Sequence, residues 1–273
     1  MLPERFRVIR PYLAAHLQAN QPLPSLFEVL YYLCKPGKQG RASRYIERVD
    51  ETGDYRAITF KGFKRPFYYP KDCSWVDLCS TIDECFDPRN WHHYITEQTP
   101  VGANDVVVDC GAAEGLFTFI CAQQASKVFA FEPLPKFVSA LNKNFEGSSN
   151  VALYPWALGY KEQKAGLTDN EIFSAISPQG PIEIEIKTLD GTLLSSSEPI
   201  TFLKADVEGF EFQLLLGAEE LLRRYRPKIA ITVYHRTNNV LQIESFLKEV
   251  QPDYRFATKG ISEHGGPVML HAW

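Results

Sequence analysis

The segment Val106-Val-Val-Asp-Cys-Gly-Ala-Ala-Glu-Gly115 decides the fold of this chain. Its three valines form a short β-rich run that ends at Asp109, and small residues then make a turn into an apolar segment beginning near Leu116. A strand that passes through a glycine-containing turn into a helix is the nucleoside-binding design of open α/β sheets. The segment therefore predicts an α/β protein with a ligand at the carboxyl end of its first central strand.

The residues that follow alternate β-rich runs with helical patterns, which indicates a parallel sheet covered on both faces. The predicted strands span residues 106–109, 128–132, 151–154, 200–205 and 228–234. Two last runs, 254–258 and 268–273, flank a Gly-rich link and predict an antiparallel hairpin. Apolar residues at helical spacing predict helical faces between the strands, one of them formed by Phe212, Leu215, Leu216 and Leu222.

Two regions differ from this alternation. Residues 182–186 alternate isoleucine with glutamate, so we expect an inserted antiparallel segment within residues 159–197. Residues 1–95 combine short helical patterns with a predicted hairpin of residues 55–60 and 63–69. We expect them to form a helical and hairpin cap that contacts the substrate, on a main domain of residues 96–273.

The composition is that of a globular protein with a core, since 45% of the 273 residues are hydrophobic and 23% are charged. The six cysteines include no CxxC pair, which favours reduced packing residues over a zinc site. No stretch approaches the roughly 20 consecutive apolar residues of a membrane helix. We therefore expect a cytoplasmic protein without a membrane span.

Charge is distributed unevenly along the chain. Residues 1–71 contain 13 Lys and Arg against 6 Asp and Glu, whereas residues 72–273 contain 16 against 27. The negative main domain disfavours a nucleic-acid partner, because the phosphate backbone would be repelled. The basic N-terminal region is either simply solvated or meets an anionic substrate or carrier, and composition does not decide between the two.

The turn after the first strand departs from the dinucleotide fingerprint G-x-G-x-x-G, because position 113 is alanine and Glu114 would repel a pyrophosphate. S-Adenosylmethionine has no phosphate and carries a sulfonium and an ammonium group, so carboxylates beside the turn favour it. Small side chains let the backbone approach such a ligand closely. The predicted cofactor-binding loop comprises Asp109, Gly111, Ala112, Ala113 and Gly115.

The ends of the next two strands complete the predicted cofactor site. Glu132, followed by Pro133, lies 21 residues after Gly111. This is close to the offset of about 20 residues at which an acidic side chain accepts hydrogen bonds from ribose hydroxyls. Trp156 and Ala157 follow the third strand and offer a flat ring and a small residue beside an adenine.

Several motifs occur in the order and spacing of a known family. They are Val107-Val-Asp-Cys-Gly-Ala-Ala-Glu-Gly-Leu-Phe-Thr118, Phe131-Glu-Pro133, Trp156-Ala-Leu158, Thr188-Leu-Asp190, Leu203-Lys-Ala-Asp-Val-Glu-Gly-Phe-Glu211, Leu216-Gly-Ala218 and Arg226-Pro-Lys-Ile-Ala-Ile-Thr-Val-Tyr-His235. Over roughly residues 100–273 the chain resembles the FkbM-type methyltransferases, which usually have asparagine where this chain has Ala113 or Glu114. The resemblance implies a Rossmann-like fold whose seven-stranded sheet ends in an antiparallel hairpin. It also implies methyl transfer to a hydroxyl of a sugar, polyketide or peptide natural product.

The candidate catalytic residues follow the fourth and fifth strands. His235 is the natural general base, because the ordinary pKa of histidine, about 6.5, permits proton uptake and release at neutral pH. Asp206 is expected to contact the substrate hydroxyl, to orient His235, or to cap the next helix, and it is also counted among the cofactor-binding residues. Glu208 is expected to hold the turn or to reach the cofactor. Asp206 and His235 could also bind a divalent metal, which is not favoured because magnesium sites usually contain more carboxylates.

Two other kinds of function stay open at this point. One is a non-catalytic Rossmann-like binding module, which Asp109, Glu132 and Asp206 disfavour because a degenerate site tends to lose such residues. The other is an N-methyltransferase that acts on a small-molecule or carrier-bound amine. An NAD oxidoreductase is the weakest alternative, because of Ala113. The identity of the small-molecule, carrier-linked or glycan-linked acceptor, and the oligomeric state, do not follow from the sequence.

Overall fold

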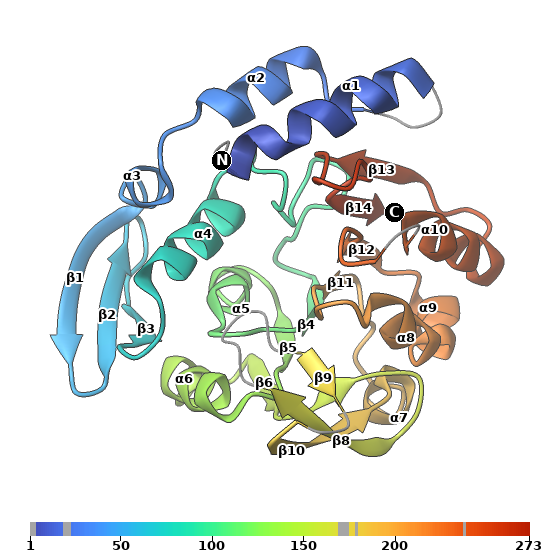
Figure 1. The fold of residues 1–273 in the computed structure, drawn as a ribbon. Helices are drawn as coiled ribbons and strands as arrows, with labels where there is room; N and C mark the ends of the chain where they lie inside the picture. The colour runs from blue at the N-terminus through green and yellow to red at the C-terminus, as the bar shows by residue number, and fades with distance from the viewer. Residues whose placement is uncertain (1–3, 19–22, 169–174, 178–179, 237–238) are drawn as a thin grey trace.

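A seven-stranded sheet forms the centre of the computed structural model, which describes residues 4–18, 23–168, 175–177, 180–236 and 239–273 (Figure 1). The strand order is β13-β14-β12-β11-β4-β5-β6. The strands are β4 (Val106–Cys110), β5 (Lys127–Phe131), β6 (Val151–Tyr154), β11 (Phe202–Ala205), β12 (Lys228–Thr232), β13 (Phe256–Lys259) and β14 (Met269–Ala272). β14 pairs antiparallel with both β12 and β13. The predicted Rossmann-like α/β sheet with a closing hairpin is confirmed.

Helices cover both faces of this sheet (Figure 1). Successive side chains of a strand point to opposite faces, and the buried core of β4 divides accordingly. Val107 packs in one core with α4 (Trp75–Phe86), α5 (Leu116–Cys121) and α6 (Pro135–Phe145). Val106 and Val108 pack in the other core, which contains α7 (Leu189–Leu193), α8 (Glu211–Leu216), α9 (Glu219–Tyr225) and α10 (Asn239–Val250).

The single helical face predicted from Phe212 to Leu222 is wrong, because the chain forms two helices there. α8 ends at Leu216 and α9 starts at Glu219. Between them lies Gly217, where a Cβ atom would collide with the backbone carbonyl of Gly159. Leu216 is 37% exposed and does not join the buried face. The close approach of another backbone, which periodicity cannot reveal, breaks the helix at this glycine.

A second, four-stranded sheet follows β6, in the order β7-β10-β8-β9. Its strands are β7 (Ala157–Leu158), β8 (Gln163–Thr168), β9 (Ala175–Ser177) and β10 (Ile182–Lys187). β10 pairs antiparallel with β8 and parallel with β7. The small sheet therefore connects directly to the end of β6, where Trp156 and Ala157 lie.

The N-terminal region forms helices and a three-stranded antiparallel sheet. It contains η1 (Glu4–Val8), α1 (Ile9–Gln18), α2 (Leu26–Cys34), α3 (Lys38–Ala42), β1 (Ile46–Thr52), β2 (Tyr55–Phe60) and β3 (Phe67–Pro70). The predicted hairpin is confirmed by the pairing of β2 with β3. β1 was not predicted, because it is an exposed edge strand with no alternation of apolar and polar residues. α2 was not predicted either, although Ser25 and Glu28 form a capping box at its start.

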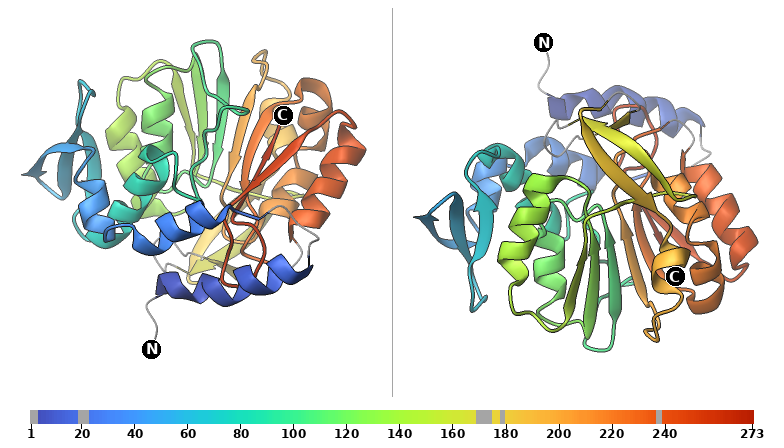
Figure 2. Two further views of the ribbon diagram at one scale, coloured as in Figure 1. Left: turned by 90° about the horizontal axis from the view of Figure 1, so that it is seen from above. Right: turned by 90° about the horizontal axis from the view of Figure 1, so that it is seen from below.

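The N-terminal sheet projects from the side of the molecule, whereas α1, α2 and the small sheet lie toward one end of the central strands (Figure 2). β3 is held to α6 by Asn144, whose side chain accepts from the backbone N–H of Tyr68 at 2.7 Å and donates to its carbonyl at 2.9 Å. None of the helices in the described ranges is long and apolar enough to cross a membrane.

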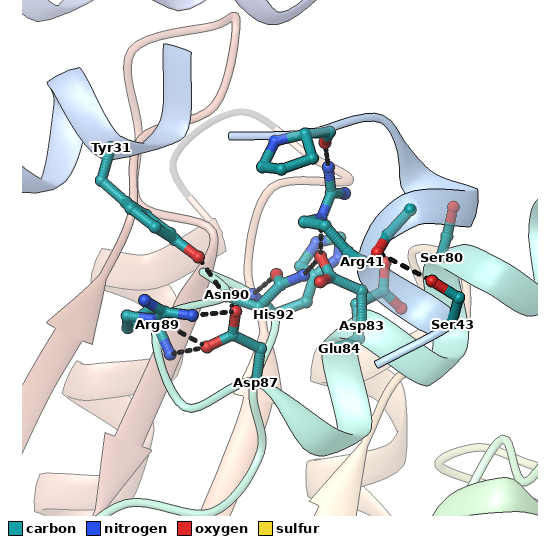
Figure 3. Close-up of polar contacts among 12 residues, drawn as sticks. Tyr31, Arg41, Ser43, Ser80, Asp83, Glu84, Asp87, Arg89, Asn90 and His92 are labelled. Carbon is teal, nitrogen blue, oxygen red and sulfur yellow. Dashed lines mark hydrogen bonds and ion pairs between the residues drawn. The ribbon is translucent and has the colours of Figure 1, made fainter. Parts of the chain in front are cut away.

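Polar contacts hold α2 and α3 against α4 and the segment after it (Figure 3). Arg41 forms an ion pair of 2.8 Å with Asp83, and their side chains are only 8% and 2% exposed. Asn90 donates to the same Asp83 carboxylate at 2.6 Å. Asp87 accepts from the Tyr31 hydroxyl at 3.0 Å and from the Arg89 guanidinium at 2.9 and 3.0 Å. The helices of the N-terminal region are thus fixed by buried charges as well as by apolar packing.

Candidate active site

One cavity of about 830 Å³ opens at the carboxyl ends of β4, β11 and β12, between the central sheet and the N-terminal region. It brings together most residues of the predicted site. Those that line it are Gly111, Ala112, Ala113, Glu132, Pro133, Trp156, Ala157, Asp206, Glu208 and His235. Asp109 and Gly115 do not line it. The N-terminal region contributes Val8, Tyr32, Lys35 and Arg41 to the opposite wall.

The loop after β4 is held tightly against its neighbours. The backbone N–H groups of Gly111 and Ala112 both donate to the carbonyl of Phe131, at 3.0 and 2.9 Å. Gly111 has a φ of 77°, and a Cβ atom there would collide with the carbonyl of Asp206. Ala113 also has a positive φ, 47°, which is uncommon for a residue other than glycine. The loop is therefore shaped by contacts with β5 and with the segment after β11.

Asp109 lies beneath the loop rather than in the cavity. Its side chain is fully buried, and its carboxylate contacts the Lys204 ammonium at 2.9 Å and the Thr118 hydroxyl at 2.6 Å. Lys204 also donates to the carbonyl of Gly111 at 2.6 Å. Burial opposes the charge of Lys204, but the nearby carboxylates of Asp109 and Asp206 outweigh it and raise the pKa of this ammonium. Asp109 thus supports the loop from below through Lys204.

Glu132 joins the loop to the start of α6. Its carboxylate accepts from the backbone N–H of Ala113 at 2.9 Å and from that of Leu134 at 2.8 Å. The side chain is 7% exposed, and burial raises the pKa of this carboxyl to about 7. Each carboxylate oxygen keeps a further lone pair, so Glu132 can still accept a hydrogen bond from a ligand hydroxyl in the cavity.

His235 lies between two carboxylates at the end of β12. Its Nδ1 is 2.7 Å from Oε1 of Glu211, and its Nε2 is 3.3 Å from Oε2 of Glu208. Burial opposes protonation of the ring, but the hydrogen bond to Glu211 and the charges of Asp206 and Glu208 outweigh it. Together they raise the pKa of His235 to about 9. The ligand-free ring therefore carries a positive charge at neutral pH.

Asp206 has different partners from those expected. It accepts from the Tyr94 hydroxyl at 2.7 Å and from the Thr232 hydroxyl at 3.2 Å, whereas Glu211 is the residue that orients His235. It is not the N-cap of α8, because Phe210 occupies that position. Burial opposes its ionisation, but Lys204, His235 and His92 outweigh it and lower the pKa of this carboxyl.

Glu208 occupies a strained turn beside Asp206. Its φ is 51°, and Gly209 follows with a φ of 93°. Residues in such sparsely populated conformations cluster at functional sites, where the surrounding structure enforces them. Burial and the charge of Asp206 raise the pKa of the Glu208 carboxyl to about 7. The turn directs a carboxyl that is easily protonated toward the imidazole.

Asp206, Glu211 and His235 also form a cluster whose possible metal-ligating atoms lie within 4.8 Å of one another. Oε1 of Glu211 already accepts from the N–H of Gly209 at 3.1 Å, from Thr232 at 3.2 Å and from His235 at 2.7 Å. These hydrogen bonds make Glu211 the acceptor that fixes the imidazole. A metal ion here would have to displace them.

Three residues of the site were missed by the sequence-based prediction. Glu211 belongs to the quoted run Asp206–Glu211 and could have been found from its place three residues after Glu208. Lys204 carried a signal, because a lysine inside an otherwise apolar strand must be paired when buried. Tyr94 lies in an irregular segment far from the motifs, and no local pattern marks it.

A family model described as the methyltransferase FkbM domain matches residues 109–256. The crystal structure of methyltransferase FkbM from Methylobacillus flagellatus KT is similar at 15% identity and a TM-score of 0.52. That match covers 98% of this chain and 59% of the other, so the chain spans about three fifths of its length. Among curated proteins, no sequence matches.

Two further solved structures have lower TM-scores. An rRNA methylase from Streptococcus thermophilus has 15% identity and a TM-score of 0.42, and the match covers 63% of this chain and 86% of the other. A protein from Streptococcus mutans, solved in complex with SAH, has 16% identity and a TM-score of 0.43, with coverage of 63% and 89%.

Proposed function

The chain belongs to the FkbM methyltransferase family, and from this premise we propose that it transfers a methyl group to a hydroxyl of a sugar, polyketide or peptide natural product. As a member of this family it is an enzyme that uses S-adenosylmethionine.

The residues around the loop fit S-adenosylmethionine chemically. The cavity volume, about 830 Å³, lies within the range of roughly 300–1,000 Å³ typical of small-molecule sites. Glu132 would accept from the ribose hydroxyls, and Trp156 with Ala157 would flank the adenine. Gly111, Ala112 and Ala113 would present backbone to the ligand, while Asp109 and Gly115 would act by shaping the loop. The carboxylates of Glu114 and Glu132 line the cavity beside the loop, and the ammonium of Lys204 is paired with Asp109, which suits a cation without phosphates.

The catalytic roles follow from the contacts of His235. When bound, S-adenosylmethionine would supply a methyl group whose carbon is attacked in line by an oxygen nucleophile, with the positive sulfur as the leaving group. Glu211 holds Nδ1 of His235, so Nε2 is the nitrogen that exchanges protons at the cavity. In its neutral form Nε2 takes the proton of the acceptor hydroxyl. Glu208 contacts the same nitrogen, and Asp206 accepts from the hydroxyl of Tyr94, which belongs to the N-terminal region.

A single observation carries this proposal: an imidazole fixed by a fully buried carboxylate opens onto the same cavity as the cofactor loop. A binding module would not need a base oriented in this way. Alignment of the two reactants is still the larger contribution, since it can remove about 7–11 kcal/mol of the barrier. A positioned base adds about 10²–10⁴-fold.

The N-terminal region, residues 1–95, is proposed to form the acceptor side of the cavity. Tyr32 of α2 and Trp91 both line it, and their rings stack with centroids 4.0 Å apart. Such rings suit the apolar face of a sugar or a polyketide. A cytoplasmic place of action is also proposed, because cysteines in the thiol form, such as Cys79, Cys85, Cys110 and Cys121, persist in reducing compartments.

One observation favours a second candidate, methyl transfer to an amine. The acceptor side of the cavity also contains the carboxylates of Asp77, Asp83, Glu84 and Glu263. These would attract a cationic group, although Asp83 and Glu84 already pair with Arg41 and His92. The chemistry of the product separates the two candidates.

Calorimetry with S-adenosylhomocysteine tests the cofactor site. Wild-type protein should bind this ligand. Glu132→Gln should bind it at least about tenfold more weakly, which corresponds to about 1.4 kcal/mol. Glu162→Gln, a substitution at an exposed position, is the control and should bind it as wild-type protein does. Wild-type protein that does not bind would refute the site, and unchanged binding by Glu132→Gln would refute the ribose assignment.

The acceptor is then sought with a panel of sugars, polyketides and amines, by following formation of S-adenosylhomocysteine. NMR of the product distinguishes an O-methyl from an N-methyl group. A product methylated only on nitrogen would replace the hydroxyl proposal by the amine one.

A further inference from the structure

Glu114 has a side chain that the roles described so far do not explain. It lies in the turn between β4 and α5, lines the cavity, and is only 1% exposed. Neither of its carboxylate oxygens has a hydrogen bond of good geometry among the described residues, although the Thr81 hydroxyl on α4 and the backbone N–H of Glu114 itself lie near enough to stabilise the charged form. A buried carboxylate without such hydrogen bonds is costly and usually has a reason, such as a ligand.

The surroundings of Glu114 favour a cationic ligand. Burial, with a contribution from the charge of Glu84 on α4, raises the pKa of the Glu114 carboxyl to about 7. Lys204 lowers it, but that ammonium is already bound to Asp109 and to the carbonyl of Gly111. The carboxyl is therefore ready to ionise when a positive group arrives from the cavity.

The other carboxylates of the loop region are already engaged. Asp109 is buried beneath the loop against Lys204 and Thr118. Glu132 accepts from the N–H groups of Ala113 and Leu134. Of these three groups, Glu114 is the one that lines the cavity while both of its carboxylate oxygens lack a hydrogen bond of good geometry.

We propose that Glu114 is the counter-ion for the α-ammonium group of S-adenosylmethionine. The inference rests on the proposed cofactor site and adds a second contact to it, at the amino-acid end of the ligand. Glu132 and Trp156 hold the nucleoside end, on the side of β5 and β6. Glu114 faces α4, so the amino-acid end extends toward that helix. The buried ion pair selects a ligand with a free amino group over a nucleoside alone.

The test compares two ligands that differ only in the amino group. Calorimetry is performed with S-adenosylhomocysteine and with its deamino analogue, in which hydrogen replaces the α-amino group. For wild-type protein we expect the first to bind at least about tenfold more tightly. Glu114→Gln should bind S-adenosylhomocysteine more weakly and the deamino analogue as before, so that most of the preference is lost. Glu132→Gln should bind both ligands more weakly and keep the ratio of the two affinities.

A second variant at position 114 controls for the possibility that Glu114→Gln does not fold. Glu114→Met removes the buried charge without leaving an amide to satisfy, so it should fold and should show the same loss of preference. Adenosine binding verifies the nucleoside end in both variants. If either variant weakens both ligands equally, or leaves S-adenosylhomocysteine unaffected, the role of Glu114 is refuted while the cofactor site stands. If wild-type protein binds neither ligand, the cofactor site fails and the role of Glu114 fails with it.

Discussion

The imidazole of His235 shows how a single residue acquires its chemistry from its neighbours. Glu211 fixes one ring nitrogen at 2.7 Å and Glu208 lies 3.3 Å from the other. The same carboxylates that orient the ring also stabilise its charged form, so that the pKa of His235 is raised to about 9. A histidine poised in this way is a good proton carrier, but it must lose a proton before it can act as a base.

We predict that kcat/KM for methyl transfer rises with pH through about 9. The sign follows from the raised pKa: only neutral His235 accepts the hydroxyl proton, and the neutral fraction increases as pH passes that value. Initial rates with the acceptor found by the panel measure the profile. His235→Gln should lower turnover by about 10²–10⁴-fold, with nearly unchanged affinity for S-adenosylhomocysteine.

Glu211→Gln provides the matched control, because it keeps the shape of the side chain and removes its charge. The pKa of His235, followed by NMR, should fall, and the rate profile should move to lower pH with it. If the pH dependence of kcat/KM is the same in wild-type protein, His235→Gln and Glu211→Gln, another group carries out the proton transfer.

At the scale of elements, a buried ion pair joins two strands and the loop that follows one of them. Lys204 on β11 contacts Asp109 on β4, and the same ammonium donates to the carbonyl of Gly111. The two side chains are 5% and 0% exposed. Because neither charge has access to water, each depends on the other, and the loop depends on both.

We predict that Lys204→Met lowers the free energy of unfolding by about 3–5 kcal/mol, since it leaves the Asp109 carboxylate buried and unpaired. Urea denaturation measures the change. The double variant Lys204→Met/Asp109→Leu should recover much of this loss, because it removes both charges. Affinity for S-adenosylhomocysteine should stay reduced in both, since Gly111 has lost its donor. A loss below about 1 kcal/mol in the single variant would contradict the role of the pair.

At the scale of the whole molecule, the cavity belongs to two regions of the chain. The central sheet supplies the loop and the polar residues at its carboxyl edge, and the N-terminal region supplies the opposite wall. Within the N-terminal region, the network around Asp83 and Asp87 holds α2 and α3 to α4 and the segment after it (Figure 3). The position of that wall therefore depends on contacts remote from the reacting groups.

We predict that Arg41→Met lowers the free energy of unfolding by about 3 kcal/mol, because Asp83 stays buried and, among the described residues, keeps Asn90 as its hydrogen-bond partner. The KM for the acceptor should rise severalfold, whereas affinity for S-adenosylhomocysteine should change little. Arg48→Ala is the control, since its ion pair with Asp50 is largely exposed. Equal effects on acceptor and cofactor would mean that the network holds the whole site, and not the acceptor wall alone.

The sequence by itself determined the central architecture. The central strands along the chain, the loop after Asp109 and the hairpin formed by the last two runs follow from local patterns, and the structure confirms these elements. Burial on both faces makes parallel strands nearly continuous apolar runs, which is why they are visible in one sequence. The alternatives left open for Asp206 were not resolved locally, because its side chain had three chemically reasonable partners.

Only the tertiary structure decided which charges meet. Asp109 faces Lys204, 95 residues away, and Asp206 accepts from Tyr94, which no motif marks. The break between α8 and α9 depends on the backbone of Gly159. Such contacts join residues distant in sequence, and the free energy of a buried charge depends on its partner rather than on its neighbours along the chain. Local patterns therefore place the site at the sheet edge, whereas folding assigns each carboxylate its role.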